Sequence, residues 1–159
     1  MSRNSLSFEK EPRDQDYRAL VHAVGRMAAY ILVVVRDELG LTDSGKGVVR
    51  QLEALGAVGV RRDSWPGTKL EGGQAQVYRV PVTVESLTAV AGAADGLYSW
   101  CQPELPEDLA LVRIDESPLL ASVAHEHDAW LELSAEEELQ LEAIFLGRLG
   151  HLVKNLRRG

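Results

Sequence analysis

The chain has 159 residues, and its 17 basic and 24 acidic side chains give a net charge of −7. With 45% hydrophobic and 26% charged residues, the composition is that of one globular domain and not of a disordered or fibrous chain. The first residues lack the apolar segment of a secretion signal, and no apolar run approaches the about 20 residues that a membrane-spanning helix needs. We therefore expect a cytoplasmic protein without a membrane segment.

Residues 1–13 are polar and show no hydrophobic periodicity, which predicts a flexible N-terminal arm. From Asp14, apolar residues recur at spacings of three and four residues. This pattern predicts a helix that runs to about Glu38 and is ended by Gly40. Residues 14–159 are expected to form a single domain, because no linker or internal repeat follows.

Two further helices and a hairpin are predicted next. Thr42, Asp43 and Ser44 favour the start of a helix that ends at Gly56, and Thr83 favours the start of another over residues 84–95. Between these helices, residues 57–62 and 74–82 alternate in hydrophobicity like the two strands of a hairpin. The loop between the strands is unusually long and contains two turn signals.

The last third predicts a second hairpin and a final helix. Residues 110–114 and 119–133 have the composition of strands, with a turn over residues 115–118 between them. Ser134 and Glu137 form a capping-box pattern that opens a helix continuing to the C-terminus. The expected fold is therefore α+β, with a mainly antiparallel sheet made of two hairpins packed against about four helices.

Negative charge is concentrated between Asp95 and Glu142, where 13 acidic residues accompany one basic residue, Arg113. Clustered carboxylates steer cationic partners and disfavour contact with nucleic-acid phosphates. The pattern favours a basic protein partner over nucleic acid. The competing interpretation is that these acids are simply dispersed over a solvated surface.

A metal-dependent enzyme is a second candidate function, suggested by the segment SVAHEHDAW. On a strand, His125 and His127 would share one face and offer two imidazole ligands, with Glu126 and Asp128 on the other face. A third ligand, such as Cys101, His22 or His151, would have to come from elsewhere in the fold. The metal hypothesis thus stays open, although we expect no cofactor.

Cys101 and the basic residues of the first half suggest two more functions. Cys101 together with His125 or His127 resembles a thiol–imidazole pair, but a single cysteine beside Trp100 is more typical of a small core residue. A winged-helix DNA-binding regulator is suggested by the helix that contains Lys46 and by the hairpin after it. Its phosphate-contacting residues would be Arg50, Arg61, Arg62, Lys69 and Arg79.

The segments WPGT (65–68), LYSW (97–100), LPEDL (105–109) and AHE (124–126) resemble small uncharacterised bacterial proteins of immunity or defence contexts. The resemblance implies a stoichiometric protein partner and no particular reaction. Aromatic anchors among carboxylates suit such a contact, because the rings supply desolvated area and the acids set orientation. We therefore predict a non-catalytic module that binds and occludes a basic protein partner, with these candidate contact residues: Trp65, Trp100, Glu104, Glu107, Asp108, Glu126 and Asp128.

Overall fold

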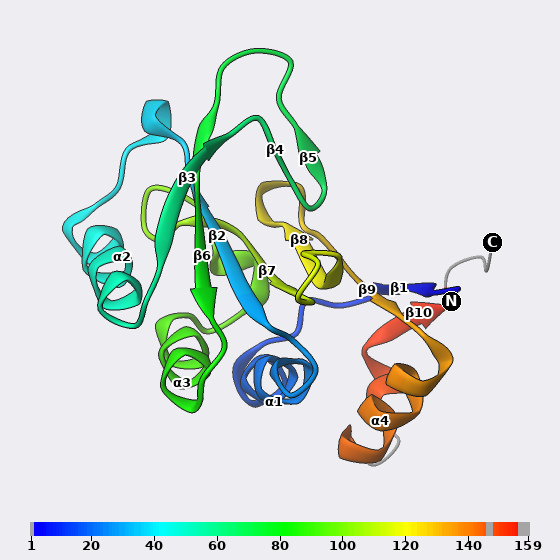
Figure 1. The fold of residues 1–159 in the computed structure, drawn as a ribbon. Coiled ribbons are helices and arrows are strands. Elements are labelled where there is room, and N and C mark those ends of the chain that lie inside the picture. The colour runs from blue at the N-terminus through cyan, green and yellow to red at the C-terminus, as the bar shows by residue number, and fades with distance from the viewer. Residues whose placement is uncertain (1, 146–147, 156–159) are drawn as a thin grey trace.

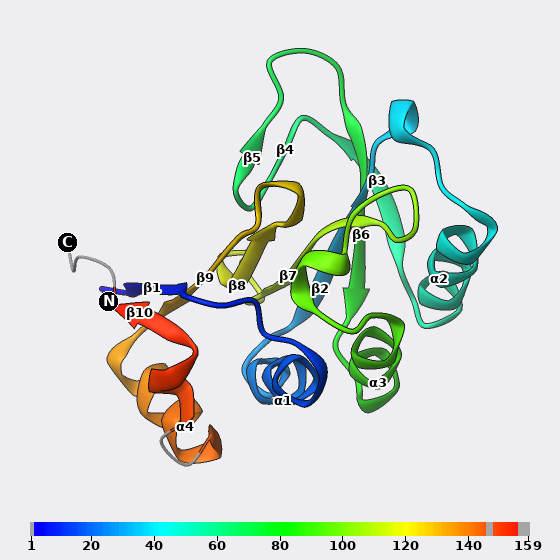
Figure 2. The same cartoon turned by 180° about the vertical axis from the view of Figure 1, so that it is seen from behind.

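The computed structural model describes residues 2–145 and 148–155. Within those ranges an eight-stranded sheet has the order β10-β1-β9-β8-β7-β2-β6-β3, and every neighbouring pair is antiparallel. Four α-helices accompany it in the same ranges, so the α+β class predicted from the sequence is confirmed. Figure 1 shows the helices and the labelled strands, and Figure 2 shows them from behind.

The N-terminal third differs from the prediction in two places. Strand β1 (Asn4–Phe8) lies between β9 (Asp128–Leu133) and β10 (Val153–Asn155), so the expected flexible arm is wrong. Its Leu6 and Phe8 side chains are buried in the core, which fixes the segment. The helix predicted to reach Glu38 instead ends at Gly25 as α1 (Asp14–Gly25).

The residues after α1 form strand β2 (Tyr30–Val35), which is central in the sheet between β6 (Ala75–Pro81) and β7 (Glu107–Val112). Its sequence YILVVV is rich in β-branched residues and is buried on both faces, as expected for a central strand. Gly25 allows α1 to approach the neighbouring helix, because a Cβ there would lie 2.5 Å from a Leu87 methyl carbon.

The next helices and the first hairpin are confirmed. The Thr42 side chain caps α2 (Asp43–Ala54), and Thr83 caps α3 (Val84–Ala93) in a capping box with Ser86. Strand β3 (Val58–Arg62) pairs with β6 along its length. The long loop between them contains a small hairpin of its own, β4 (Ser64–Trp65) and β5 (Thr68–Lys69).

The second predicted hairpin contains three strands. The segment expected as one strand over 119–133 is divided into β8 (Pro118–Val123) and β9 by the short 3-10 helix η3 (Ala124–Glu126). The capping box at Ser134 is confirmed and opens α4 (Ala135–Phe145). That helix does not continue to the C-terminus, because a 3-10 turn, η4 (Arg148–His151), and β10 follow. The part of the predicted helix after Asn155 lies outside the described residues.

The sheet has a core on each face. The helices cover the larger core, which contains Ile31, Val33 and Leu111 from the strands. The smaller core lies on the opposite face, where Leu32, Val34 and Val77 pack against Trp65 from the β4–β5 hairpin. In Figures 1 and 2 this hairpin projects from the end of the sheet that is remote from α1 and α3. Among the described helices, none has the length and apolar character needed to cross a membrane.

The capping box of α4 also carries an ion pair that makes stability depend on pH. Arg113 donates to both carboxylate oxygens of Glu137, at 3.0 and 2.6 Å. The Arg113 hydrogen bond is the main cause that lowers the pKa of Glu137 below its usual 4.5, although partial burial opposes it. Ionised Glu137 thus stabilises the fold above its unfolded pKa, and this contribution is lost as the pH falls through the lowered folded value.

We expect Glu137→Gln to lower the free energy of unfolding by about 1 kcal/mol at pH 7, because Gln keeps the cap and loses the charge. The difference between wild type and variant should shrink as the pH falls below about 5 and vanish in stronger acid. Urea unfolding at a series of pH values measures it. The exposed Glu85→Gln variant in the first turn of α3 is the control, and a difference independent of pH would contradict the assignment.

Candidate functional site

Polar side chains gather on the smaller-core face where β2 ends and β7 begins. The pairing of these strands contains a bulge, because Leu32 is opposite Ala110 while Val34 is opposite Glu107. The extra residue in β7 is accommodated at Asp108, whose φ is 57°, a left-handed conformation that Asp tolerates better than most residues. The bulge brings two consecutive carboxylates, Glu107 and Asp108, into this end of the molecule.

Asp108 joins three parts of the chain. Its side chain is 1% exposed and accepts hydrogen bonds from the Trp65 indole Nε1 at 2.9 Å and from the Ala124 backbone N–H at 3.1 Å. Burial raises the pKa of Asp108, and the two hydrogen bonds oppose that shift. Asp108 therefore holds the β4–β5 hairpin and η3 against the sheet.

Gln102 organises the neighbouring loop. Its side-chain oxygen accepts from the Arg36 backbone N–H at 2.7 Å, while its amide nitrogen donates to the backbone oxygens of Arg36 and Gly40. The Gln102 backbone N–H donates to the Glu107 carboxylate at 2.8 Å. These bonds fix the turn after β2, which contains the 3-10 helix η1 (Asp37–Leu39).

A pocket of about 350 Å³ opens between these segments. We call it the Arg36 pocket, and the residues that line it are Arg36, Leu39, Cys101, Gln102, Glu107 and His125. The Arg36 guanidinium carbon lies 5.2 Å from the centre of the Trp65 ring, in a cation–π arrangement. The pocket thus combines a cation, a buried carboxylate, an imidazole and a thiol from three separate segments.

Cys101 is protonated at neutral pH in this setting. Burial, followed by the hydrogen bond and negative charge of Glu107, raises the pKa of its thiol to about 11. A nucleophilic cysteine needs the thiolate, which positive neighbours favour and carboxylates disfavour. The thiol–imidazole hypothesis is therefore not supported by the environment of Cys101.

The structure separates the predicted contact residues into two groups. Trp65, Trp100, Glu107 and Asp108 are buried, with at most 6% of each residue exposed, so their prediction as surface contacts is wrong. Glu104, Glu126 and Asp128 are exposed. Trp100 lies far inside the larger core, where its indole N–H donates to the Tyr17 hydroxyl at 2.8 Å.

The two histidines do not share a strand face, as the metal hypothesis required. His125 belongs to η3, and His127 follows it with a φ of 52°. The ring of His127 stacks on Tyr98 with 5.3 Å between ring centres, while His125 Nε2 lies 3.6 Å from the Glu126 carboxylate. Among the described residues no group of three or more His, Cys, Asp or Glu side chains is arranged to hold a metal ion.

The basic residues of the winged-helix hypothesis are mostly engaged within the fold. Arg62 and Arg79 both pair with Glu116, Arg61 pairs with Asp37, and Lys69 pairs with Asp63. The helix that contains Lys46 is present as α2, but the helix predicted before it gives way in part to the central strand β2. The arrangement therefore does not match that of a winged helix.

Sequence reasoning missed Arg36 and Gln102. Arg36 could have been found from its position directly after the apolar run YILVVV. Once that run is recognised as a strand, the charged residue that follows it marks the strand end. Gln102 had no signal of its own, because its role depends on backbone groups that are more than 60 residues away in sequence.

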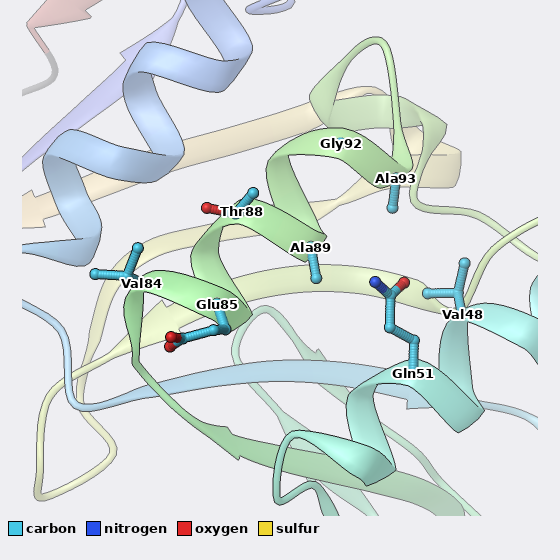
Figure 3. Close-up of a pocket in the computed structure, with 8 residues that line it drawn as sticks. All are labelled: Val48, Gln51, Val84, Glu85, Thr88, Ala89, Gly92 and Ala93. Carbon is cyan, nitrogen blue, oxygen red and sulfur yellow. The ribbon is translucent and has the colours of Figure 1, made fainter.

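A second depression lies between α2 and α3, on the helical side of the sheet. Its volume is about 520 Å³. Figure 3 shows Val48 and Gln51 of α2 facing Ala89 and Ala93 of α3 across it. Glu85 is its one charged lining residue, so the groove offers little chemistry.

Comparison of the chain with protein-family models, with curated proteins and with solved structures gives no match. The candidate site therefore rests on its own geometry.

Proposed function

We propose that the protein is a non-catalytic binding module, of the immunity type, that occludes a basic protein partner. The proposed contact surface is an acidic rim made of the exposed residues Glu38, Glu104, Glu126 and Asp128. In this proposal the exposed carboxylates of the acidic rim take the contact role that the sequence-based hypothesis gave to Glu107 and Asp108, which are buried.

The observation that carries the proposal is the convergence of three acidic segments around the Arg36 pocket. Residues 36–40, 101–107 and 124–128 each line or adjoin it. Arg36 is their one Arg or Lys, and it lies in the pocket wall. The negative charges of Asp128 and Glu11 also raise the pKa of the Tyr98 hydroxyl, although burial is the larger cause of that shift. Such a concentration of exposed carboxylates accelerates association with a basic surface.

We expect the double variant Glu126→Lys/Asp128→Lys to slow association with the partner about tenfold at low salt, and to flatten its salt dependence. Both side chains are exposed, so the fold should be retained. The partner is first recovered as a defined heterocomplex by native mass spectrometry of untagged protein, and association is then measured by surface plasmon resonance.

The matched control is Glu53→Lys/Glu71→Lys, which makes the same charge change at exposed positions outside the acidic rim. It should alter the association rate much less. Equal effects of the two double variants would show that only net charge matters. A partner that is acidic, or rates unchanged by reversal at the rim, would contradict the proposal.

A further inference from the structure

The half-buried Arg36 side chain has no ion-pair partner among the described residues. Among the described residues, its Nε is the one buried side-chain nitrogen or oxygen without a hydrogen-bond partner. The guanidinium stacks on Trp65 and forms no ion pair with any described side chain. A buried donor is normally satisfied, because leaving it unpaired is unfavourable. The Nε itself is inaccessible, but a ligand carboxylate in the pocket would give the terminal guanidinium nitrogens the anionic partner that no described side chain provides.

Glu107 places a buried carboxyl group in the same pocket. Its side chain is 2% exposed and is held by the Gln102 backbone N–H at 2.8 Å. Although both residues line the pocket, the Arg36 guanidinium and the Glu107 carboxylate do not form a salt bridge. The pocket therefore keeps a positive and a negative group apart.

We propose that the Arg36 pocket binds a free α-amino acid. The α-carboxylate accepts hydrogen bonds from the Arg36 guanidinium, which suits a carboxylate because its planar donors can bind both oxygens. The α-ammonium group faces Glu107. The pocket volume of about 350 Å³ is at the lower end of small-molecule sites and suits a ligand of this size.

The surroundings favour an amino acid with a cationic side chain. The exposed Glu126 lies beside the lining residue His125, with its carboxylate 3.6 Å from His125 Nε2. The exposed Glu38 is next in sequence to the lining residue Leu39. The side chain of a bound ligand extends toward this part of the pocket. Carboxylates there attract a lysine or arginine side chain and repel that of glutamate. A simple anion such as acetate is disfavoured too, because Glu107 and the acidic rim oppose it.

Amino-acid binding does not depend on the proposed protein partner. It is measured on the isolated chain, whereas the partner hypothesis concerns the exposed rim. If the experiments contradict one of these two proposals, the other is therefore unaffected.

Calorimetric titration of the full chain with L-lysine tests the proposal, using three matched ligands. N-acetyl-L-lysine lacks the α-ammonium charge, L-lysine amide lacks the carboxylate, and L-glutamate has the opposite side-chain charge. We expect L-lysine to bind and each of the other three to bind at least about tenfold more weakly. No binding of L-lysine up to about 10 mM, or equal binding of the blocked ligands, would overturn the proposal.

Two variants tie binding to the pocket. Arg36→Gln should abolish L-lysine binding while the protein remains folded, because the substitution breaks no ion pair with a described residue and costs only the cation–π contact with Trp65. Glu107→Gln retains an acceptor oxygen for the Gln102 N–H and should weaken binding about tenfold or more. Arg50→Gln, an exposed position on α2, should bind as the wild type does.

The indole N–H resonance of Trp65 gives a local readout, because this group lies between Asp108 and the stacked Arg36. It should shift on saturation with L-lysine in the wild type and in Arg50→Gln. Unchanged L-lysine affinity in Arg36→Gln would overturn the proposal.

Discussion

Replacement of Asp108 by Ala is expected to lower the free energy of unfolding by about 3 to 5 kcal/mol. The side chain is 1% exposed and accepts from Trp65 Nε1 and from Ala124 N–H, so both donors would lose their acceptor. Ala is also less suited than Asp to the φ of 57° at this position. Urea unfolding monitored by circular dichroism measures the loss.

Asp108→Asn tests the same two hydrogen bonds with a smaller change. Its amide oxygen can still accept one of the two hydrogen bonds, and Asn tolerates a left-handed backbone, so the loss should be about half as large. The control Asp63→Ala removes an exposed carboxylate that pairs with Lys69, and it should change stability by less than about 1 kcal/mol. If Asp108→Ala and Asp63→Ala are equally mild, Asp108 is not the link between hairpin and sheet.

Trp100→Ala is expected to lower the free energy of unfolding by about 4 to 5 kcal/mol, or to prevent folding. The indole is fully buried in the larger core, and its loss leaves a cavity. It also removes the donor to Tyr17, whose hydroxyl donates in turn to the Val90 carbonyl at 2.7 Å. Chemical denaturation with near-ultraviolet circular dichroism measures the effect.

A milder change probes the same chain of hydrogen bonds. Tyr17→Phe retains the ring and leaves the Trp100 N–H and the Val90 carbonyl without their partner, so we expect a loss of about 2 kcal/mol. Trp130, which is half-buried, is the control, and Trp130→Ala should destabilise less than Trp100→Ala. A greater effect at Trp130 would mean that Trp100 is not a principal core residue.

The predictions that succeeded depend on local chemistry. Thr42, Thr83 and Ser134 each cap a helix through contacts within three residues, so their role is readable from neighbouring positions alone. The prediction for residues 30–35 failed because a short apolar run fits either a buried helix or a buried strand. The deciding influence is pairing with β6 and β7, which begin more than 40 residues later.

The candidate site was less predictable than the fold, because its parts come from distant segments. Arg36, Trp65 and Gln102 meet only through the sheet and the β4–β5 hairpin. The burial of Glu107 and Asp108 depends on a bulge in β7 that leaves no mark in the hydrophobic pattern. Acidic composition indicates that carboxylates are plentiful in this region, but it does not distinguish the buried ones from the exposed ones.

The position of β1 has a consequence for how the chain is made. During synthesis this strand leaves the ribosome long before its two partners, β9 and β10, which lie more than a hundred residues later in the sequence. Until they emerge, Leu6 and Phe8 have no sheet neighbour to cover them. One border of the sheet can therefore close only after residues 128–155 have been translated, and this delay exposes a strand edge to other nascent chains or to chaperones.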